Sequence, residues 1–109
     1  MENQNATKSL AMLKKKGYKC FTVEHFNHHA GVKQDLFGFV DILCLKENEI
    51  VGVQTTSLKC FDNHIKKIAA HKNLMIVKKS GIKIVLHGWH QIKHPKRDGL
   101  IWACRMQNF

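Results

Sequence analysis

The sequence predicts an α/β domain in which a mixed sheet is flanked by helices, and three observations carry this prediction. Two apolar, β-branched segments, 39–45 and 50–56, follow each other across a short polar turn, as the strands of a hairpin do. Segments with apolar side chains at helical spacing lie before and after this pair, at 6–16 and at about 57–71. The chain has 109 residues, enough for one compact domain, so residues 1–109 are assigned to a single domain.

Periodicity and turn residues predict the other elements. The first helix is expected to end where Gly17 can adopt the left-handed conformation of a helix C-terminus. Ser57 is expected to be the N-cap of the second helix, since serine is favoured there. In chain order we expect a helix at 6–16, a strand at 18–26, a polar loop at 27–38, hairpin strands at 39–45 and 50–56, helices from 57 or 58 to about 71 and at 73–79, and strands at 82–92 and 100–106.

The charge of the chain favours a polyanionic partner. Lysine and arginine number 18 against 8 aspartate and glutamate residues, which gives a net charge of +10. Such a domain attracts nucleic acid, because each phosphate that it neutralises releases counterions. The alternative is a solvated surface without a specific partner. The side chains most expected to meet phosphate are Lys33, Lys59, Lys66, Lys67 and the loop residue His28, with Lys78, Lys79, Lys96 and Arg97 extending the basic surface.

Other classes of protein are disfavoured by the sequence. The four cysteines form no CxxC pair, and the eight histidines offer no tight set of four ligands, so a structural zinc site is not expected. No apolar run approaches the roughly 20 residues that span a bilayer. The first residues are polar and lack the apolar core of a signal peptide. We therefore expect a cytoplasmic protein with reduced cysteines and no membrane partner.

A single acid inside an apolar strand is the first pointer to chemistry. Asp41 is the one charged residue in 39–45, and a buried carboxylate costs several kcal/mol unless it has a partner. That partner is either a hydrogen-bond donor or a divalent cation, which prefers oxygen ligands. Gln54 lies at the end of the adjoining strand, where its amide oxygen can approach Asp41, and Glu24 on the preceding strand could supply a third oxygen.

The order of elements and the spacing of these residues resemble the PD-(D/E)XK nuclease superfamily, whose restriction-endonuclease-like core is αβββαβ. Residues 35–43, DLFGFVDIL, look like the corresponding segment of small phage and bacterial members, often described as Holliday-junction-resolvase-like. The resemblance implies a nuclease that cuts DNA with Mg²⁺ or Mn²⁺, in the cytoplasm of a host if the chain is phage-encoded. It implies metal ligation by Asp41, Gln54, Glu24 and the Thr55 carbonyl.

The sequence departs from the family pattern at two positions. Gln54 takes the place of the second acid and adds no charge, and Thr56 takes the place of the lysine that assists the attacking water. Lys59 or Lys66 on the following helix could reach back to replace that lysine. A descendant that binds nucleic acid without cutting it is the second hypothesis. A protein that reuses the fold for interaction with other proteins is the third.

Two further expectations concern the loop acid and the assembly. Asp35 could be another ligand or could cap the turn at 36–38, and we favour the cap. A domain of this size covers little of a duplex, so a homodimer, or a module working beside other proteins, is expected. No base-reading motif is present, which favours recognition of backbone or structure over sequence.

Overall fold

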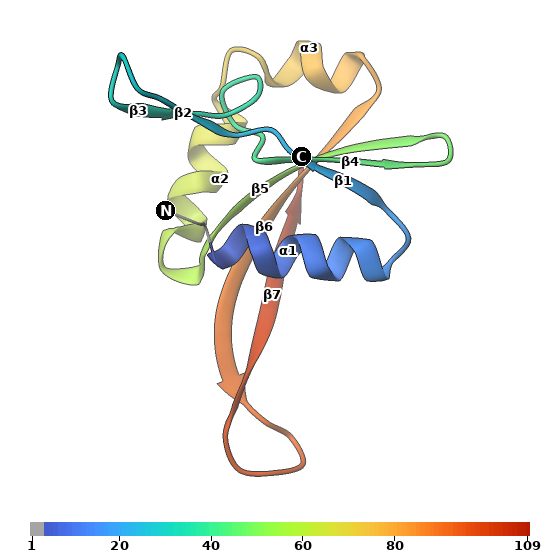
Figure 1. The fold of residues 1–109 in the computed structure, drawn as a ribbon, viewed down its shortest axis with the longest axis vertical. Helices are drawn as coiled ribbons and strands as arrows, with labels where there is room; N and C mark the ends of the chain where they lie inside the picture. The colour runs from blue at the N-terminus through green and yellow to red at the C-terminus, as the bar shows by residue number, and fades with distance from the viewer. Residues whose placement is uncertain (1–3) are drawn as a thin grey trace.

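A five-stranded mixed sheet forms the centre of the molecule (Figure 1). The computed structural model describes residues 4–109 and, within them, all side chains except those of Phe26, Asn27 and Lys33. In sheet order the strands are β1 (Lys19–Thr22), β4 (Ile42–Lys46), β5 (Glu49–Ser57), β6 (Ile82–Lys93) and β7 (Leu100–Asn108). Strands β5 and β6 run parallel, and the other neighbours are antiparallel. The predicted α/β class with a mixed sheet is confirmed.

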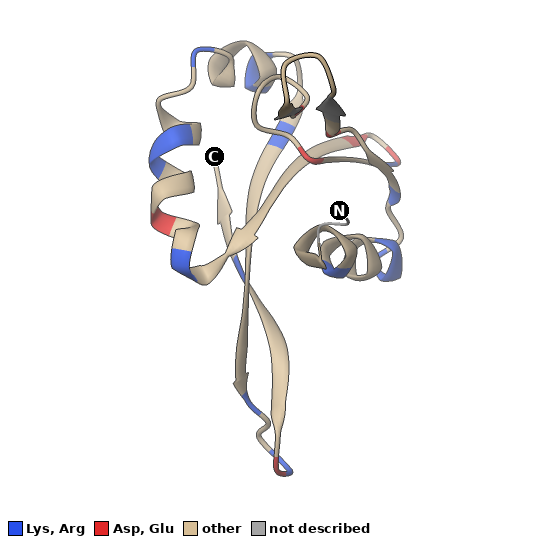
Figure 2. Ribbon diagram, turned by 60° about the vertical axis from the view of Figure 1, so that its left-hand side comes forward, with Lys and Arg blue, Asp and Glu red and all other residues tan. Residues whose placement is uncertain are grey.

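Helices cover both faces of this sheet. On one face lies α1 (Gln4–Lys15); on the other lie the 3₁₀ turn η1 (Leu58–Cys60), α2 (Phe61–Ala69) and α3 (Leu74–Lys79) (Figure 2). The core under α1 consists of Ala6, Leu13, Ile42, Cys44, Val51 and Val53. The core under α2 and α3 consists of Phe39, Val40, Phe61, Ile68, Val77, Ile84 and Leu86. Burial on both faces explains why the central strands are almost wholly apolar in sequence.

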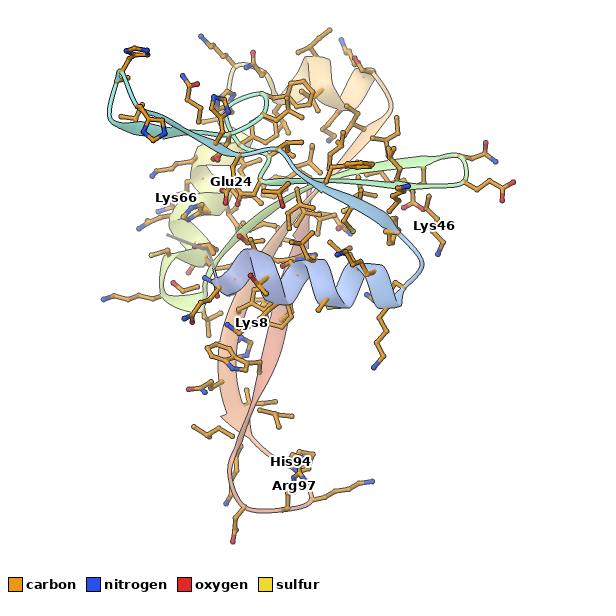
Figure 3. The ribbon with its side chains drawn as sticks, in the orientation of Figure 1. Lys8, Glu24, Lys46, Lys66, His94 and Arg97 are labelled. Carbon is orange, nitrogen blue, oxygen red and sulfur yellow. The ribbon has the colours of Figure 1, made fainter. Side chains whose placement is uncertain are left out.

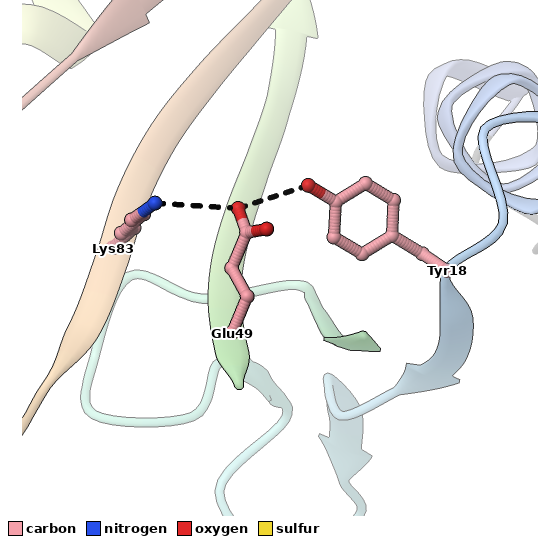
Figure 4. A network of polar contacts seen from close by, with 3 residues as sticks. All are labelled: Tyr18, Glu49 and Lys83. Carbon is pink, nitrogen blue, oxygen red and sulfur yellow. Dashed lines mark hydrogen bonds and ion pairs between the residues drawn. The ribbon is translucent and has the colours of Figure 1, made fainter. Parts of the chain in front are cut away.

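A small network fixes the end of the sheet where β5 begins. The Tyr18 hydroxyl donates to Glu49 Oε1 at 2.9 Å, and Lys83 Nζ lies 3.5 Å from the same oxygen (Figure 4). These side chains come from the start of β1, the start of β5 and the start of β6. The opposite end of β5 is therefore the end left for the predicted site.

The segment between β1 and β4 differs from its prediction. The expected strand 18–26 breaks after Thr22, and the expected loop contains a separate hairpin of β2 (His25–Asn27) and β3 (Val32–Gln34). After β3 the chain folds back on itself, because the backbone N–H groups of Leu36 and Val40 each donate at 2.9 Å to the other residue's carbonyl. The strand expected at 39–45 therefore starts only at Ile42.

A tight turn explains that late start. Phe37 and Gly38 both have positive φ, at 61° and 92°, and a methyl group at Gly38 would overlap the His71 imidazole. Phe39 and Val40 are apolar because they are buried under α2 and α3, although they do not belong to a strand. An apolar run alone does not separate these two cases.

The later elements lie close to their predicted positions. The helix expected from 57 or 58 begins as η1 and continues as α2, which ends at Ala69. Ser57 occupies the N-cap position of η1, but its hydroxyl makes no capping bond among the described residues. Strands β6 and β7 are slightly longer than predicted, and together they project from the molecule as a narrow ribbon (Figure 1). Within residues 4–109, no helix combines the length and the apolar character needed to cross a membrane.

Candidate metal and nucleic-acid site

Three carboxylates from separate segments converge near the end of β5. Glu24 lies between β1 and β2 (Figure 3), Asp35 follows β3 directly, and Asp41 directly precedes β4. One carboxylate oxygen from each lies within 4.8 Å of the others. We call these three residues the carboxylate cluster. The structure thus confirms the expected approach of Glu24 to Asp41 and adds Asp35.

Backbone hydrogen bonds hold the cluster in place. Val23 N–H donates to the Asp41 carbonyl at 2.9 Å, which places Glu24 beside Asp41. Asp41 N–H donates to the Val53 carbonyl at 2.9 Å and so attaches Asp41 to β5. The turn at 36–40 then returns Asp35 to the same point. The cluster follows from the strand pairing and from one tight turn.

The environment of Asp41 disfavours its charged form. Its side chain is buried, and Oδ2 accepts hydrogen bonds from Thr55 N at 2.9 Å and from Thr55 Oγ1 at 3.2 Å. Burial raises the pKa of Asp41 to about 8, and the nearby Asp35 and Glu24 raise it further, while the Thr55 N–H acts in the opposite direction. Asp41 therefore needs a proton or a cation close by.

Asp35 has the role that we had not favoured. Its backbone carbonyl accepts the bond from Gly38 N–H at 3.0 Å, so the backbone closes this turn. Its carboxylate instead faces Asp41 and Glu24, and Oδ1 is buried without a hydrogen-bond partner among the described residues. The expectation that the Asp35 side chain caps the turn is therefore wrong. A buried oxygen without a donor is suited to a cation.

Gln54 and Thr56 lie on the face of β5 that α2 covers. Gln54 is half-buried and lines a cavity of about 650 Å³ together with Asp35. Thr56 Oγ1 lies 3.3 Å from His64 Nδ1, which also lies 2.9 Å from the Cys60 carbonyl. Since that carbonyl can only accept, the neutral His64 ring carries its proton on Nδ1 and leaves Nε2 unprotonated. His64 thus occupies the neighbourhood of the missing motif lysine.

The lysines at this cavity differ from the two that the sequence suggested. Lys67 and Lys72 line it, along with His64 and His71. Lys59 and Lys66 are exposed on η1 and α2 and are not among its lining residues. Residues 64, 67, 68 and 71 are spaced for one helix face, and this spacing is the signal that would have identified the two histidines.

Two other predicted contacts lie in the β2–β3 hairpin. The Lys33 side chain falls outside the described residues. His28 is exposed in the turn at 28–31 that joins the two strands, at the tip of a hairpin separate from the main sheet (Figure 1). Neither residue is thereby brought to the carboxylate cluster.

The donor set of the cluster fits a divalent cation of the hard type. Carboxylate oxygens are the ligands that Mg²⁺ and Mn²⁺ prefer, and a positive ion would offset the mutual repulsion of the three acids. Of the predicted ligands Asp41, Gln54, Glu24 and Thr55, the structure brings Asp41 and Glu24 together with Asp35. Thr55 contacts Asp41 through its N–H and hydroxyl groups, and Gln54 faces the adjoining cavity.

Comparison of the chain with protein-family models, with curated proteins and with solved structures gives no match. The resemblance to PD-(D/E)XK nucleases therefore remains a prediction from the sequence. What the site can do has to be argued from its own residues.

Proposed function

We propose that this protein is a divalent-metal-dependent nuclease that hydrolyses phosphodiester bonds in DNA and recognises backbone or structure more than sequence. The observation that carries the proposal is the convergence of Glu24, Asp35 and Asp41 beside a cavity lined by Lys67 and Lys72. Acids that hold a cation and lysines that hold phosphate are the two halves of a site for phosphodiester hydrolysis.

The chain order of the elements supports a restriction-endonuclease-like core. The elements α1, β1, β4, β5, α2 and β6 follow the order αβββαβ, with an antiparallel pair β4–β5 and a parallel pair β5–β6. The β2–β3 hairpin, α3 and β7 would be additions to that core. Asp41 at the start of β4 and Gln54 near the end of β5 occupy the corresponding places of the motif.

Each residue has a role that its position permits. Glu24, Asp35 and Asp41 would hold Mg²⁺ or Mn²⁺, and Thr55 orients the Asp41 carboxylate through two hydrogen bonds. When bound, such an ion lowers the pKa of water and stabilises negative charge on the phosphate. The unprotonated Nε2 of His64 can accept a proton in the cavity, a task that Thr56 cannot perform.

A module that binds DNA without cutting it is the second candidate. It is favoured by Gln54, which adds no charge, and by the hydrogen bond between Thr56 and His64, which fills the place of the motif lysine. This candidate retains the basic surface and predicts salt-sensitive binding without turnover.

The test is cleavage of labelled linear duplex, single-stranded and four-way-junction DNA with Mg²⁺ or Mn²⁺. We expect metal-dependent cutting that falls at least about 100-fold in Asp41→Ala, because a metal ligand is lost. Glu47→Ala is the matched control, since Glu47 is an exposed acid in the β4–β5 turn. Binding without cutting on all three substrates would instead establish the second candidate.

A further inference from the structure

The end of the β6–β7 hairpin is a two-stranded ribbon that leaves the body of the molecule. Strand β5 ends at Ser57, opposite Trp89, and beyond this pair β6 has only β7 as a neighbour. The ribbon comprises residues 90–93 paired with 100–103 and a tip at 94–99, closed by a 3.0 Å bond from His94 N–H to the Gly99 carbonyl. Figures 1 and 2 show it projecting from the rest of the fold. We call residues 90–103 the arm.

The arm makes the molecule elongated and exposes apolar side chains. The radius of gyration is 14.6 Å, whereas a compact chain of this length has about 13 Å. Leu100, Trp102 and Ile92 are 62%, 48% and 40% exposed. A ribbon of two strands is marginally stable alone, and apolar groups clustered on such a projection are typical of an interaction surface.

The charge of the arm identifies the kind of partner. Lys93, Lys96 and Arg97 are exposed at the tip, and Asp98 is the single acid between residues 90 and 103 (Figure 2). His94 adds a further group that gains positive charge when protonated. A projection with this charge is complementary to a polyanion and repels other basic surfaces, a second copy of this chain included.

The shape of the arm favours a duplex among polyanions. The major groove of B-DNA, about 12 Å wide, admits a two-stranded β-ribbon, so that basic side chains at its tip reach the phosphates while apolar ones meet base edges and sugars. On the α1 side of the ribbon, Lys8 Nζ lies 3.8 Å from the centre of the Trp102 ring. This contact braces the base of the arm and adds a cation there.

The arm also has a defined relation to the carboxylate cluster. Gln54, at the candidate site, pairs with Leu86 on β6, and Lys93 lies seven residues further along this strand. At about 3.3 Å per residue the two points are about 23 Å apart, close to the rise of seven base pairs. The arm continues beyond the end of β5 at which the cluster lies.

We propose that the arm lies in a groove of double-stranded nucleic acid whose backbone is held at the carboxylate cluster. The inference rests on the proposed function only in taking nucleic acid as the ligand. It assigns a duplex, or the duplex portion of a branched molecule, as the preferred form. It also places arm contacts about seven base pairs from the backbone position at the cluster.

The experiment compares two triple variants with the same change in net charge. Lys93→Gln/Lys96→Gln/Arg97→Gln removes the charges of the arm tip, and Lys14→Gln/Lys15→Gln/Lys19→Gln removes three exposed lysines near the end of α1. Affinity for a labelled duplex of about 30 base pairs is measured by fluorescence anisotropy in EDTA over a series of salt concentrations. We expect the arm variant to bind at least about tenfold more weakly, with a salt dependence smaller by two to three phosphate contacts, and the control to change less than about threefold.

The outcomes separate the arm from net charge, from strand type and from self-association. Equal losses in the two triple variants, or an equal loss of the arm variant on duplex and on single strands, would overturn the inference. So would an unchanged affinity for duplex together with conversion of a dimer to a monomer in sedimentation. That result would assign the arm to contact between copies.

The same proteins distinguish this inference from the proposed function. A specific loss of duplex affinity in the arm variant, without metal-dependent cutting by the unaltered protein, keeps the inference and removes the nuclease. Cutting without any specific effect of the arm variant does the reverse. Asp41→Ala should retain its affinity for duplex in EDTA, because the arm is unchanged.

Discussion

At the residue scale, Asp41 shows how one side chain can be costly to the fold and necessary to the site. It is 3% exposed, and the two hydrogen bonds from Thr55 reach only one of its oxygens. Two further acids stand beside it in the cluster. Such an arrangement stabilises little by itself, and it is the pattern of a site in which burial and like charges shift a pKa for a purpose.

This residue predicts an unusual pH dependence of stability for the metal-free protein. Because the folded pKa of about 8 lies above the ordinary value of 3.8, the folded state favours protonated Asp41. Its contribution to stability is full below about pH 4 and is lost as the pH rises through about 8, which amounts to a few kcal/mol. Urea unfolding in EDTA should show this decline, and Asp41→Asn should largely remove it.

The control for that experiment is an exposed acid. Asp98→Asn should leave the decline unchanged, since Asp98 lies at the tip of the arm. Identical pH profiles for Asp41→Asn and the unaltered protein would show that another group causes the decline. Added Mg²⁺ should stabilise the protein most above about pH 8, where the cluster is ionised without loss of a proton.

At the element scale, the attachment of α1 to the sheet depends on a buried polar contact. Trp89 Nε1 donates to Ser9 Oγ at 2.8 Å, and Ser9 Oγ lies 2.9 Å from His87 Nδ1. Since the hydroxyl accepts from Trp89, it donates to His87, whose ring is therefore neutral with its proton on Nε2. Burial lowers the pKa of His87 to about 4, which agrees with a neutral ring.

The prediction for this element is that Ser9→Ala loosens α1. It leaves the Trp89 N–H and His87 Nδ1 without their partner in a buried place, so we expect a loss of about 2–4 kcal/mol in the free energy of unfolding. Chemical denaturation measures this change. Thr7→Ala, at an exposed position of the same helix, should change it by less than about 0.5 kcal/mol. Equal effects of both substitutions would contradict the role of Ser9.

The elements also show what the sequence could and could not predict. The strands β4, β5 and β6 were found because burial on both faces makes them continuously apolar. Phe39 and Val40 were assigned to a strand on the same signal, yet they are apolar because they pack under α2 and α3. The β2–β3 hairpin, rich in polar residues, carries no alternation strong enough to predict it.

The candidate site divides in the same way. Asp41 was identifiable as a lone acid in an apolar segment, and Glu24 from its place before the hairpin. Asp35 and His64 depend on a tight turn and on how α2 packs against β5, which are tertiary facts. Local spacing therefore gave two members of the cluster, and the third required the fold.

At the scale of the whole molecule, charge and shape point to the same kind of ligand. The net charge of +10 is carried by a body of two small cores and by an arm that belongs to neither core. The cluster and the arm both lie beyond the end of β5, so a long polyanion could contact both at once. Their separation of about 23 Å exceeds the width of one groove, which suits a duplex better than a short single strand.

The independence of the arm from the body yields the last prediction. Residues 92–101 can be replaced by Asn-Gly between Gln91 and Trp102, which are paired and can close a two-residue hairpin. No residue of 92–101 belongs to either core cluster of the described chain, so the free energy of unfolding should change by less than about 1 kcal/mol. The radius of gyration in X-ray scattering should decrease, while duplex affinity should fall at least as far as in the arm-tip triple variant. A shortened protein that unfolds under native conditions would show that the arm contributes to the stability of the body, and the charge variants would then carry the test of its role in binding.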